Sequence, residues 1–482
     1  MEIALRAPEL VPPPSARPPL VGLAPDEVAA LHDALVAYHA AFAPLFQRAE
    51  QRHWALKYLE GQLLPLERTS IEPLADALAG GNVQAMQQFI SLGAWDDDVV
   101  LAKHQQLVAE ALGDPETGVL IVDGCDFPKQ GTHAVGVARQ YCGALGKVAN
   151  CQASVVACSA SARGHALVDR RLSVHEDWFT DAYADRRTRC GVPADLAFQT
   201  RTALTWALIA GLRGRGALPF RWVTGDELFG NTPVLLDRIA GAGLYYFMEV
   251  PHNVRVWAAR PPTAVPPATG RKGHPFTRLR LAPGAAAPVR VDTLAAALSP
   301  SAWQVAQIQE GSKGPLLAEV AFVRAVAVRD GLPGPDVWLV LRRALDATRE
   351  LKAYRCNAPA DTAPATLVWL LGRRWPVEQA IKEAKAELGL DHDEVRGWRG
   401  RHHHTTMTLL AQHFLARLRE RLGEKYPGAH RPPGAPPAQR DASRPAARRQ
   451  RHARLHPGGA APQLRRCALP PSAPPAAVTA PR

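Results

Sequence analysis

Two short apolar segments that end in aspartate constrain the fold of this chain more than any other feature. GVLIVDG (118–124) and FRWVTGD (220–226) are each predicted to form a short buried strand with an acid at its end. Carboxylates at or just beyond strand ends converge on one crevice when the strands share a sheet. We therefore expect Asp123 and Asp226 to lie close together, although they are far apart in the chain.

Hydrophobic periodicity predicts a mixed α/β fold around these strands. Apolar residues recur at three- and four-residue steps from about 26 to 112, which is typical of helices. Beyond Gly118, β-rich runs are followed by alternating helix and strand, which favours a mixed sheet over a barrel or a bundle. The predicted division is a helical N-terminal domain at 25–115, a core in two parts at 116–251 and 366–425, and an inserted, mainly β subdomain at 252–365.

The excess of proline and of positive charge is concentrated near the C-terminal end of the sequence. Residues 426–482 hold ten arginines, one acid and thirteen of the 43 prolines, and they account for +9 of the net charge of +12. Only +3 remains for residues 1–425, since 12 − 9 = 3. This tail and the Pro-rich residues 1–24 are predicted to be disordered. The tail has three possible interpretations: it attracts phosphates independently of sequence, it is simply solvated, or it results from an altered reading frame at the end of the gene.

Composition argues against several classes of protein. The sequence has no 18-residue apolar run, so we expect no membrane span, and its first twenty residues do not resemble a signal peptide. Its seven cysteines form no CxxC pair, which argues against a disulfide scaffold and a zinc finger. We expect a protein of the reducing cytoplasm.

A third acid is predicted on a helix near the end of the core. In RRWPVEQAIKEAKAELGL (373–390), Pro376 suits the first helical position and puts Glu378 in the first turn. At about 100° per residue, Lys385 lies about 20° from Glu378 around the helix axis, whereas Glu383 lies about 140° away. Glu378 is therefore the better partner for the two aspartates. Convergent carboxylates suit a hard cation such as Mg²⁺, although strand-end aspartates are also common as turn or helix caps and an early-helix glutamate as a dipole partner.

Several blocks of the sequence resemble bacterial insertion-sequence transposases of the DDE class. Residues 123–152, beginning DGCDFPKQG, are similar to the first catalytic block of that class, and RWVTGDELFG (221–230) is similar to the second. Residues 374–385 match the spacing Arg-x3-Glu-x6-Lys, part of a Tyr-Arg-Glu-Lys signature in one large branch. Blocks at 58–70 and 164–181 also agree, and the likeness covers roughly residues 45–415 in order.

The resemblance implies a ribonuclease-H-like core and a specific catalytic set. Asp123, Asp226 and Glu378 match the positions that hold two Mg²⁺ or Mn²⁺ ions, and Arg374 and Lys385 match the basic positions that contact DNA near the cleaved phosphate. The implied substrates are the double-stranded DNA of element ends and of a target, joined by metal-ion phosphoryl transfer. The implied working form is a homodimer that brings two ends together in the bacterial cytoplasm, at the nucleoid.

The sequence departs from the family pattern at three positions. Leu371 stands in the place of the signature tyrosine, which puts an aromatic or hydroxyl contact with DNA in doubt. Gly124 stands where relatives often have a second acid, and Asp126 stands where a glycine is common. Asp126 is therefore a rival to Asp123.

Further polar residues have alternative interpretations. Lys129, Arg139 and Lys147 flank the first aspartate and are predicted either to contact phosphates or to be solvated. His402, His403 and His404 cannot easily ligate one ion because consecutive helical residues point in different directions. The predicted N-terminal helices either recognise element ends or simply pack against the core.

Two further functions compete with the transposase hypothesis. A decayed or domesticated relative would bind DNA without cutting it. A carboxylate-pair hydrolase acting on sugars would retain its activity under chelation, whereas phosphoryl transfer by two metal ions would not.

Overall fold

The computed structural model describes residues 25–267, 277–311 and 314–425. The segments predicted to be disordered, 1–24 and the Arg/Pro-rich 426–482, lie outside the described residues. Within the described residues, no helix combines the length and the apolar character needed to cross a membrane.

The centre of the molecule is a mixed sheet with the strand order β4–β3–β1–β5–β6. β3 pairs antiparallel with both β1 and β4, whereas β5 runs parallel to β1, and β6 runs parallel to β5. Three antiparallel strands followed by two parallel ones are the arrangement of a ribonuclease-H-like core, so the predicted fold class is confirmed. The bounds are β1 (Val119–Pro128), β2 (Ala138–Cys142), β3 (Lys147–Ser161), β4 (Gly164–Ser173), β5 (Trp222–Gly225) and β6 (Tyr245–Val250).

Helices cover both faces of this sheet because alternate residues of β1 are apolar on each side. Val119 and Ile121 pack with α11 and α12 on one face, while Leu120 and Val122 pack with α7 and α9 on the other. This burial on both faces explains why GVLIV is a continuous apolar run. The helices that follow β4 are α6 (Ala184–Cys190), α7 (Arg201–Arg215), α8 (Glu227–Gly230), α9 (Pro233–Gly241), α10 (Val291–Ala297), α11 (Pro364–Leu371), α12 (Trp375–Ala386) and α13 (Trp398–Lys425).

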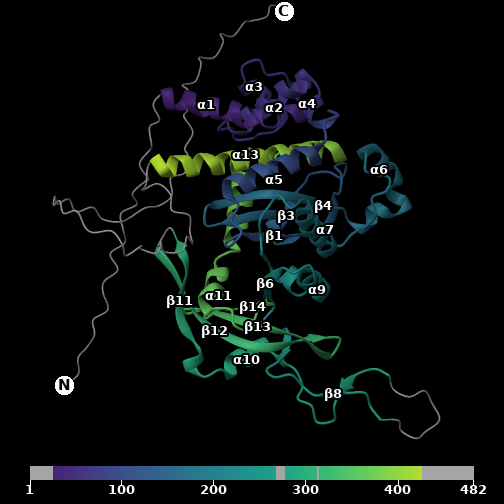
Figure 1. Cartoon of the computed structure of the whole chain (residues 1–482). Coiled ribbons are helices and arrows are strands. Elements are labelled where there is room, and N and C mark those ends of the chain that lie inside the picture. Colours follow the sequence, from purple (N-terminus) through teal and green to yellow (C-terminus); the bar gives the residue numbers. More distant parts are fainter. Residues whose placement is uncertain (1–24, 268–276, 312–313, 426–482) are drawn as a thin grey trace, which may run out of the picture.

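The predicted β-rich insertion extends the same sheet. β14 pairs antiparallel with β6, and the order continues through β13 and β12 to β7 and β10 (Figure 1). Twelve strands of the described residues belong to this sheet, whereas β8 and β9 form a separate two-stranded sheet. The insertion also has its own apolar cluster, around Val256, Ala321 and Leu339. Its strands are β7 (Arg255–Trp257), β8 (Thr263–Ala264), β9 (Arg280–Leu281), β10 (Val289–Arg290), β11 (Gln304–Gly311), β12 (Gly314–Arg329), β13 (Leu332–Ala344) and β14 (Leu351–Cys356).

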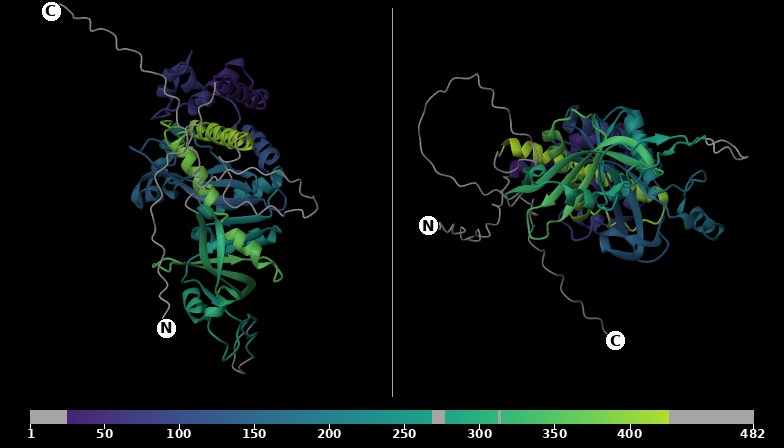
Figure 2. Two further views of the ribbon diagram at one scale, coloured as in Figure 1. Left: turned by 90° about the vertical axis from the view of Figure 1, so that its left-hand side faces the viewer. Right: turned by 90° about the horizontal axis from the view of Figure 1, so that it is seen from below.

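The N-terminal helices pack on the long helix α13. Met407, Leu410 and Phe414 of α13 share one buried cluster with residues of α1, α2, α4 and α5. Both α13 and α5 contact β4, so these two helices lie between α1–α4 and the sheet (Figure 2). The region predicted to be helical from about 26 to 112 contains α1 (Pro25–Ala40), α2 (Ala49–Gln62), α3 (Ile71–Ala77), α4 (Val83–Ser91) and α5 (Asp97–Leu112).

Buried histidines hold this helical layer together. His403 of α13 contacts the carbonyl oxygens of Ile90 and Trp95 at 2.9 and 3.1 Å, and its ring stacks on Trp95. His404 contacts the Tyr58 hydroxyl at 2.8 Å. His104 of α5 contacts the Leu167 carbonyl of β4 at 2.8 Å. These bonds account for the histidine run as packing rather than as a metal cluster.

Mild acid is expected to destabilise the protein through these histidines. Burial lowers the pKa of His104, His403 and His404 to about 4 each, whereas the unfolded chain titrates at about 6.5. Between these values the unfolded state binds protons that the folded state excludes, so stability falls as pH falls from about 6.5 towards 4. Each histidine is expected to contribute about 1.4 kcal/mol per pH unit in that range. Urea unfolding at pH 7.5 and 5.5 measures the loss; equal stability at both would contradict it, and His104→Gln should make the dependence shallower.

Candidate active site

The register of the parallel strands aligns the two aspartates. Val119 of β1 pairs with Trp222 of β5, and Ile121 pairs with Thr224. Two residues further along both strands, this register sets Asp123 level with Asp226, the first residue beyond β5. The two carboxylates therefore lie at one level of the sheet, although Asp123 lies within β1, which runs on to Pro128, and not at the end of a strand as predicted.

The third acid reaches the same place from α12. Asp123 points to the same face of β1 as Ile121 and Cys125, where Val377 and Ala380 of α12 pack. Glu378 lies in the first turn of that helix, as predicted. The structure thus gathers an acid from each of three separate segments of the chain.

Arg374, at the N-cap of α12, connects these carboxylates. Its Nη1 lies 3.9 Å from Asp123 Oδ2, its Nη2 forms a close ion pair with Glu378, and its Nε lies 3.4 Å from Oε2 of Glu249 on β6. Arg374 is therefore the common counter-charge of the group.

The electrostatics of the group favour an added cation. Burial, with repulsion from Asp226 and Glu378, raises the pKa of Asp123 to about 7 against the attraction of Arg374. Burial also raises the pKa of Asp226. Ionising these carboxyl groups therefore costs free energy. A divalent cation would lower that free energy, because an opposite charge nearby favours the charged form.

The donor set fits Mg²⁺ or Mn²⁺ by its chemistry. Asp123, Asp226 and Glu378 offer carboxylate oxygens, the ligands that hard cations prefer. Among the residues that the structure describes, no three acidic, histidine or cysteine side chains are already gathered closely enough to hold one ion. Arg374 stands between Asp123 and Glu378, so shared coordination requires the guanidinium to leave them.

The rival acids have other partners. Asp126 points to the opposite face of β1, where its Oδ2 accepts a hydrogen bond from the Gly143 N–H at 2.6 Å and its Oδ1 lies 3.5 Å from Arg201. Glu383 is buried and pairs with Arg419 of α13 at 2.6 Å, as its angle on the helix predicts. The structure therefore favours Asp123 and Glu378.

A comparison with protein families decides the wider assignment. The profile of the DDE superfamily endonucleases matches residues 41–315, more than half of the chain, including Asp123 and Asp226. The chain belongs to the DDE superfamily endonucleases. No curated protein matches it. Membership indicates an activity of the nuclease or transposase type on DNA, with a divalent metal.

The predicted DNA-contacting residues of this DDE endonuclease differ in their surroundings. Arg139 and Lys147 are exposed on the β2–β3 hairpin. Lys385 lies half-buried on the Glu378 side of α12, where its Nζ donates to the Asp126 carbonyl at 2.7 Å. Lys129 does not fit its predicted role: its Nζ lies 3.0 Å from Asp393 Oδ1, and only 11% of its side chain is exposed. A contact with phosphate would have to break that buried pair, so we withdraw Lys129 as a DNA contact.

Glu249 is a site residue that sequence reasoning missed. The register of β5 and β6 pairs Gly225 with Met248, which sets Glu249 level with Asp226. The signal was available, because LYYFMEV (244–250) is a third short strand with an acid near its end.

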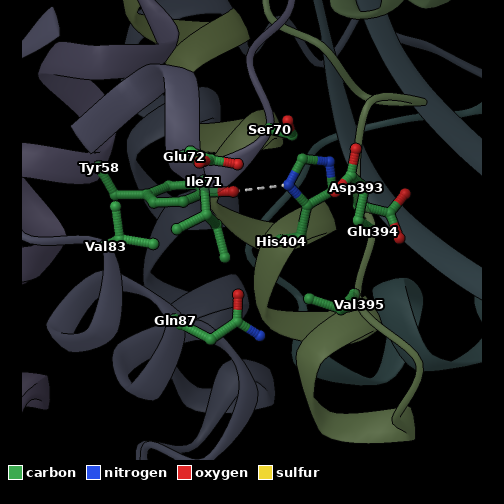
Figure 3. Close-up of a pocket in the computed structure, with 10 residues that line it drawn as sticks. All are labelled: Tyr58, Ser70, Ile71, Glu72, Val83, Gln87, Asp393, Glu394, Val395 and His404. Carbon is green, nitrogen blue, oxygen red and sulfur yellow. Dashed lines mark hydrogen bonds between the residues drawn. The ribbon is translucent and has the colours of Figure 1, made fainter. Parts of the chain in front are cut away.

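Two cavities lie in different relations to the carboxylates. One of about 530 Å³ borders them and is lined by Glu227, Glu249, Asp292 and Lys352 among others. The other, of about 170 Å³, lies between the N-terminal helices and the start of α13, where Tyr58 and His404 form their hydrogen bond (Figure 3). Neither cavity is lined by Asp123, Asp226 or Glu378, but Glu227 and Glu249 place the first beside them.

The cysteines of the described residues are all free and buried. Burial raises the pKa of the Cys125 thiol to about 11, so the thiolate that a nucleophile requires is not available near neutral pH. This agrees with the sequence, which shows no base partner for it.

Proposed function

We propose that this chain is a transposase of a bacterial insertion sequence. It cuts double-stranded DNA at the ends of the element and joins the freed 3′-hydroxyls to target DNA. The observation that carries the proposal is the group formed by Asp123, Asp226 and Glu378 around Arg374, on adjacent elements of a ribonuclease-H-like sheet.

In this proposal the three acids hold two Mg²⁺ or Mn²⁺ ions. When bound, the ions activate the attacking oxygen and stabilise the leaving oxygen of an in-line displacement. Asp123 and Asp226 are fixed by the sheet, and Glu378 by the first turn of α12, so the chain supplies positioning rather than a covalent nucleophile. Water acts as the nucleophile in the first step, and the freed 3′-hydroxyl acts in the second.

Basic residues around the group have separate roles in holding DNA. Arg374 faces the cleaved phosphate once it leaves Asp123 and Glu378, and Lys385 lies further along the same helix. Arg139 and Lys147 suit backbone phosphates because both are exposed. Bringing two element ends together requires two active sites, so we propose a homodimer that acts at the nucleoid in the cytoplasm.

Chelation is expected to abolish DNA cutting by the purified protein. The assay uses linear duplexes that carry the genomic sequences flanking the gene, incubated with Mn²⁺ or with EDTA. Removing the ions is expected to lower the cutting rate by at least about 10³-fold, because the charge stabilisation that they supply is worth several kcal/mol.

The result also separates the competing functions. Cutting that survives EDTA would contradict catalysis by metal ions. Binding of the flanking duplex without any cutting in Mn²⁺ would indicate the DNA-binding relative that lacks catalysis.

A further inference from the structure

Glu249 completes a row of acids across three neighbouring parallel strands. The β1–β5 register sets Asp123 level with Asp226, and the β5–β6 register sets Asp226 level with Glu249. Strands that run side by side hold such a row about 5 Å apart per strand. Glu249 therefore lies in the same row across the sheet as Asp123 and Asp226.

Its contacts nevertheless differ from those of the other acids. Oε1 of Glu249 lies 3.0 Å from Nζ of Lys352 on β14, and Oε2 lies 3.4 Å from Nε of Arg374. Its side chain is only 9% exposed. Both oxygens thus already have a cationic partner, which makes Glu249 a poor candidate for a further metal ligand.

The way in which Glu249 holds Arg374 determines what the guanidinium can do. Glu249 contacts Nε of Arg374, whereas Asp123 and Glu378 contact its two terminal nitrogens, Nη1 and Nη2. A guanidinium presents donors in a fixed planar fork. Anchoring it through Nε leaves the terminal nitrogens together, which suits bidentate contact with a phosphate.

We propose that Glu249 is the positioning residue for Arg374, with Lys352 fixing Glu249 from behind. When divalent cations replace Arg374 at Asp123 and Glu378, Glu249 keeps the guanidinium at the edge of the site and aims its terminal nitrogens at a DNA phosphate. This inference rests on the proposed function for its cutting assay, but its binding assay does not depend on cutting.

The binding assay tests whether Glu249→Gln raises or lowers the affinity for DNA. Glu249→Gln removes a negative charge, so electrostatics alone would strengthen binding to the DNA polyanion. Loss of the positioning of Arg374 would instead weaken DNA binding. We expect the affinity for the flanking duplex in Ca²⁺ to fall about 10-fold, the effect of losing one charge-assisted contact. Arg374→Gln should weaken binding at least as much, and in the Arg374→Gln background Glu249→Gln should leave affinity unchanged or slightly raised.

Glu319→Gln is the matched control. Glu319 also holds two cations, Arg343 at 2.7 Å and Arg349 at 2.6 Å, on strand β12 of the insertion. Its loss should leave DNA affinity unchanged or slightly raised. Melting temperatures of all variants are measured in parallel. If Glu249→Gln fails to fold, Lys352→Met replaces it, because this substitution removes the cation that holds Glu249 and leaves Glu249 itself unchanged.

The cutting assay adds a second criterion. Single-turnover cutting by Glu249→Gln should fall about 10–100-fold, the usual cost of losing a supporting residue, with the half-saturating Mn²⁺ concentration unchanged. Unchanged or tighter DNA binding by Glu249→Gln, or a large rise in the Mn²⁺ requirement, would overturn the positioning role. Failure of the wild-type protein to cut would contradict the proposed function alone, because the binding assay still decides the role of Glu249.

Discussion

Asp123→Asn, Asp226→Asn and Glu378→Gln are each expected to lower metal-dependent DNA cutting by about 10³-fold or more. Each substitution removes one carboxylate from the group that we propose holds the ions. A loss of about 4 kcal/mol of charge stabilisation corresponds to about 10³-fold in rate. The measurement is single-turnover cutting of the flanking duplex in Mn²⁺.

A neighbouring acid provides the control for these three variants. Glu227 follows Asp226 directly but is exposed, and Glu227→Gln should cut at nearly the wild-type rate. The Asp123→Asn protein should also keep or raise its melting temperature, because the substitution relieves a buried carboxylate that Asp226 and Glu378 repel. Undiminished cutting by Glu378→Gln would move the third ligand elsewhere.

Asp393→Ala is expected to destabilise the protein by about 3–5 kcal/mol, the cost of leaving buried charges without their partner. Asp393 is 1% exposed in its side chain and lies 3.0 Å from Lys129 and 2.5 Å from Arg401. Attraction to these two cations, which outweighs burial, lowers the pKa of Asp393 to about 2, so the carboxylate is ionised at neutral pH. Urea unfolding at pH 7.5 measures the loss.

The adjacent residue shows why burial decides this prediction. Glu394 pairs with Arg68 at 3.0 Å, but both side chains are more than half exposed. Glu394→Ala should therefore change stability by less than about 1 kcal/mol. Similar losses for the Asp393 and Glu394 variants would contradict the assignment of a buried charge network.

Local pattern predicted the mixed α/β core and pointed to the three acids, but their proposed role as metal ligands came from the resemblance to transposases. Asp226 directly follows its strand as predicted, whereas β1 continues past Asp123 to Pro128; the choice of Glu378 over Glu383 follows from helix geometry. Both predictions use the spacing of neighbouring residues, which can be seen in the sequence.

Long-range partners could not be predicted in this way. Lys129 lies among the predicted phosphate contacts in sequence, but its ion pair joins it to Asp393, 264 residues away. The proposed role of Glu249 depends on its contacts with Arg374 of α12 and Lys352 of β14, both far from it in the sequence. The continuation of the core sheet into the insertion likewise depends on β14 pairing with β6, which no local signal reveals.

The most direct test of the account is the anomalous scattering of Mn²⁺ in crystals of the protein. We expect anomalous peaks bounded jointly by Asp123, Asp226 and Glu378, with Arg374 moved away from Asp123 but still held by Glu249. Mn²⁺ found only at other acids, such as Glu227 and Asp292 in the neighbouring cavity, would contradict the claim that these three carboxylates share the ions.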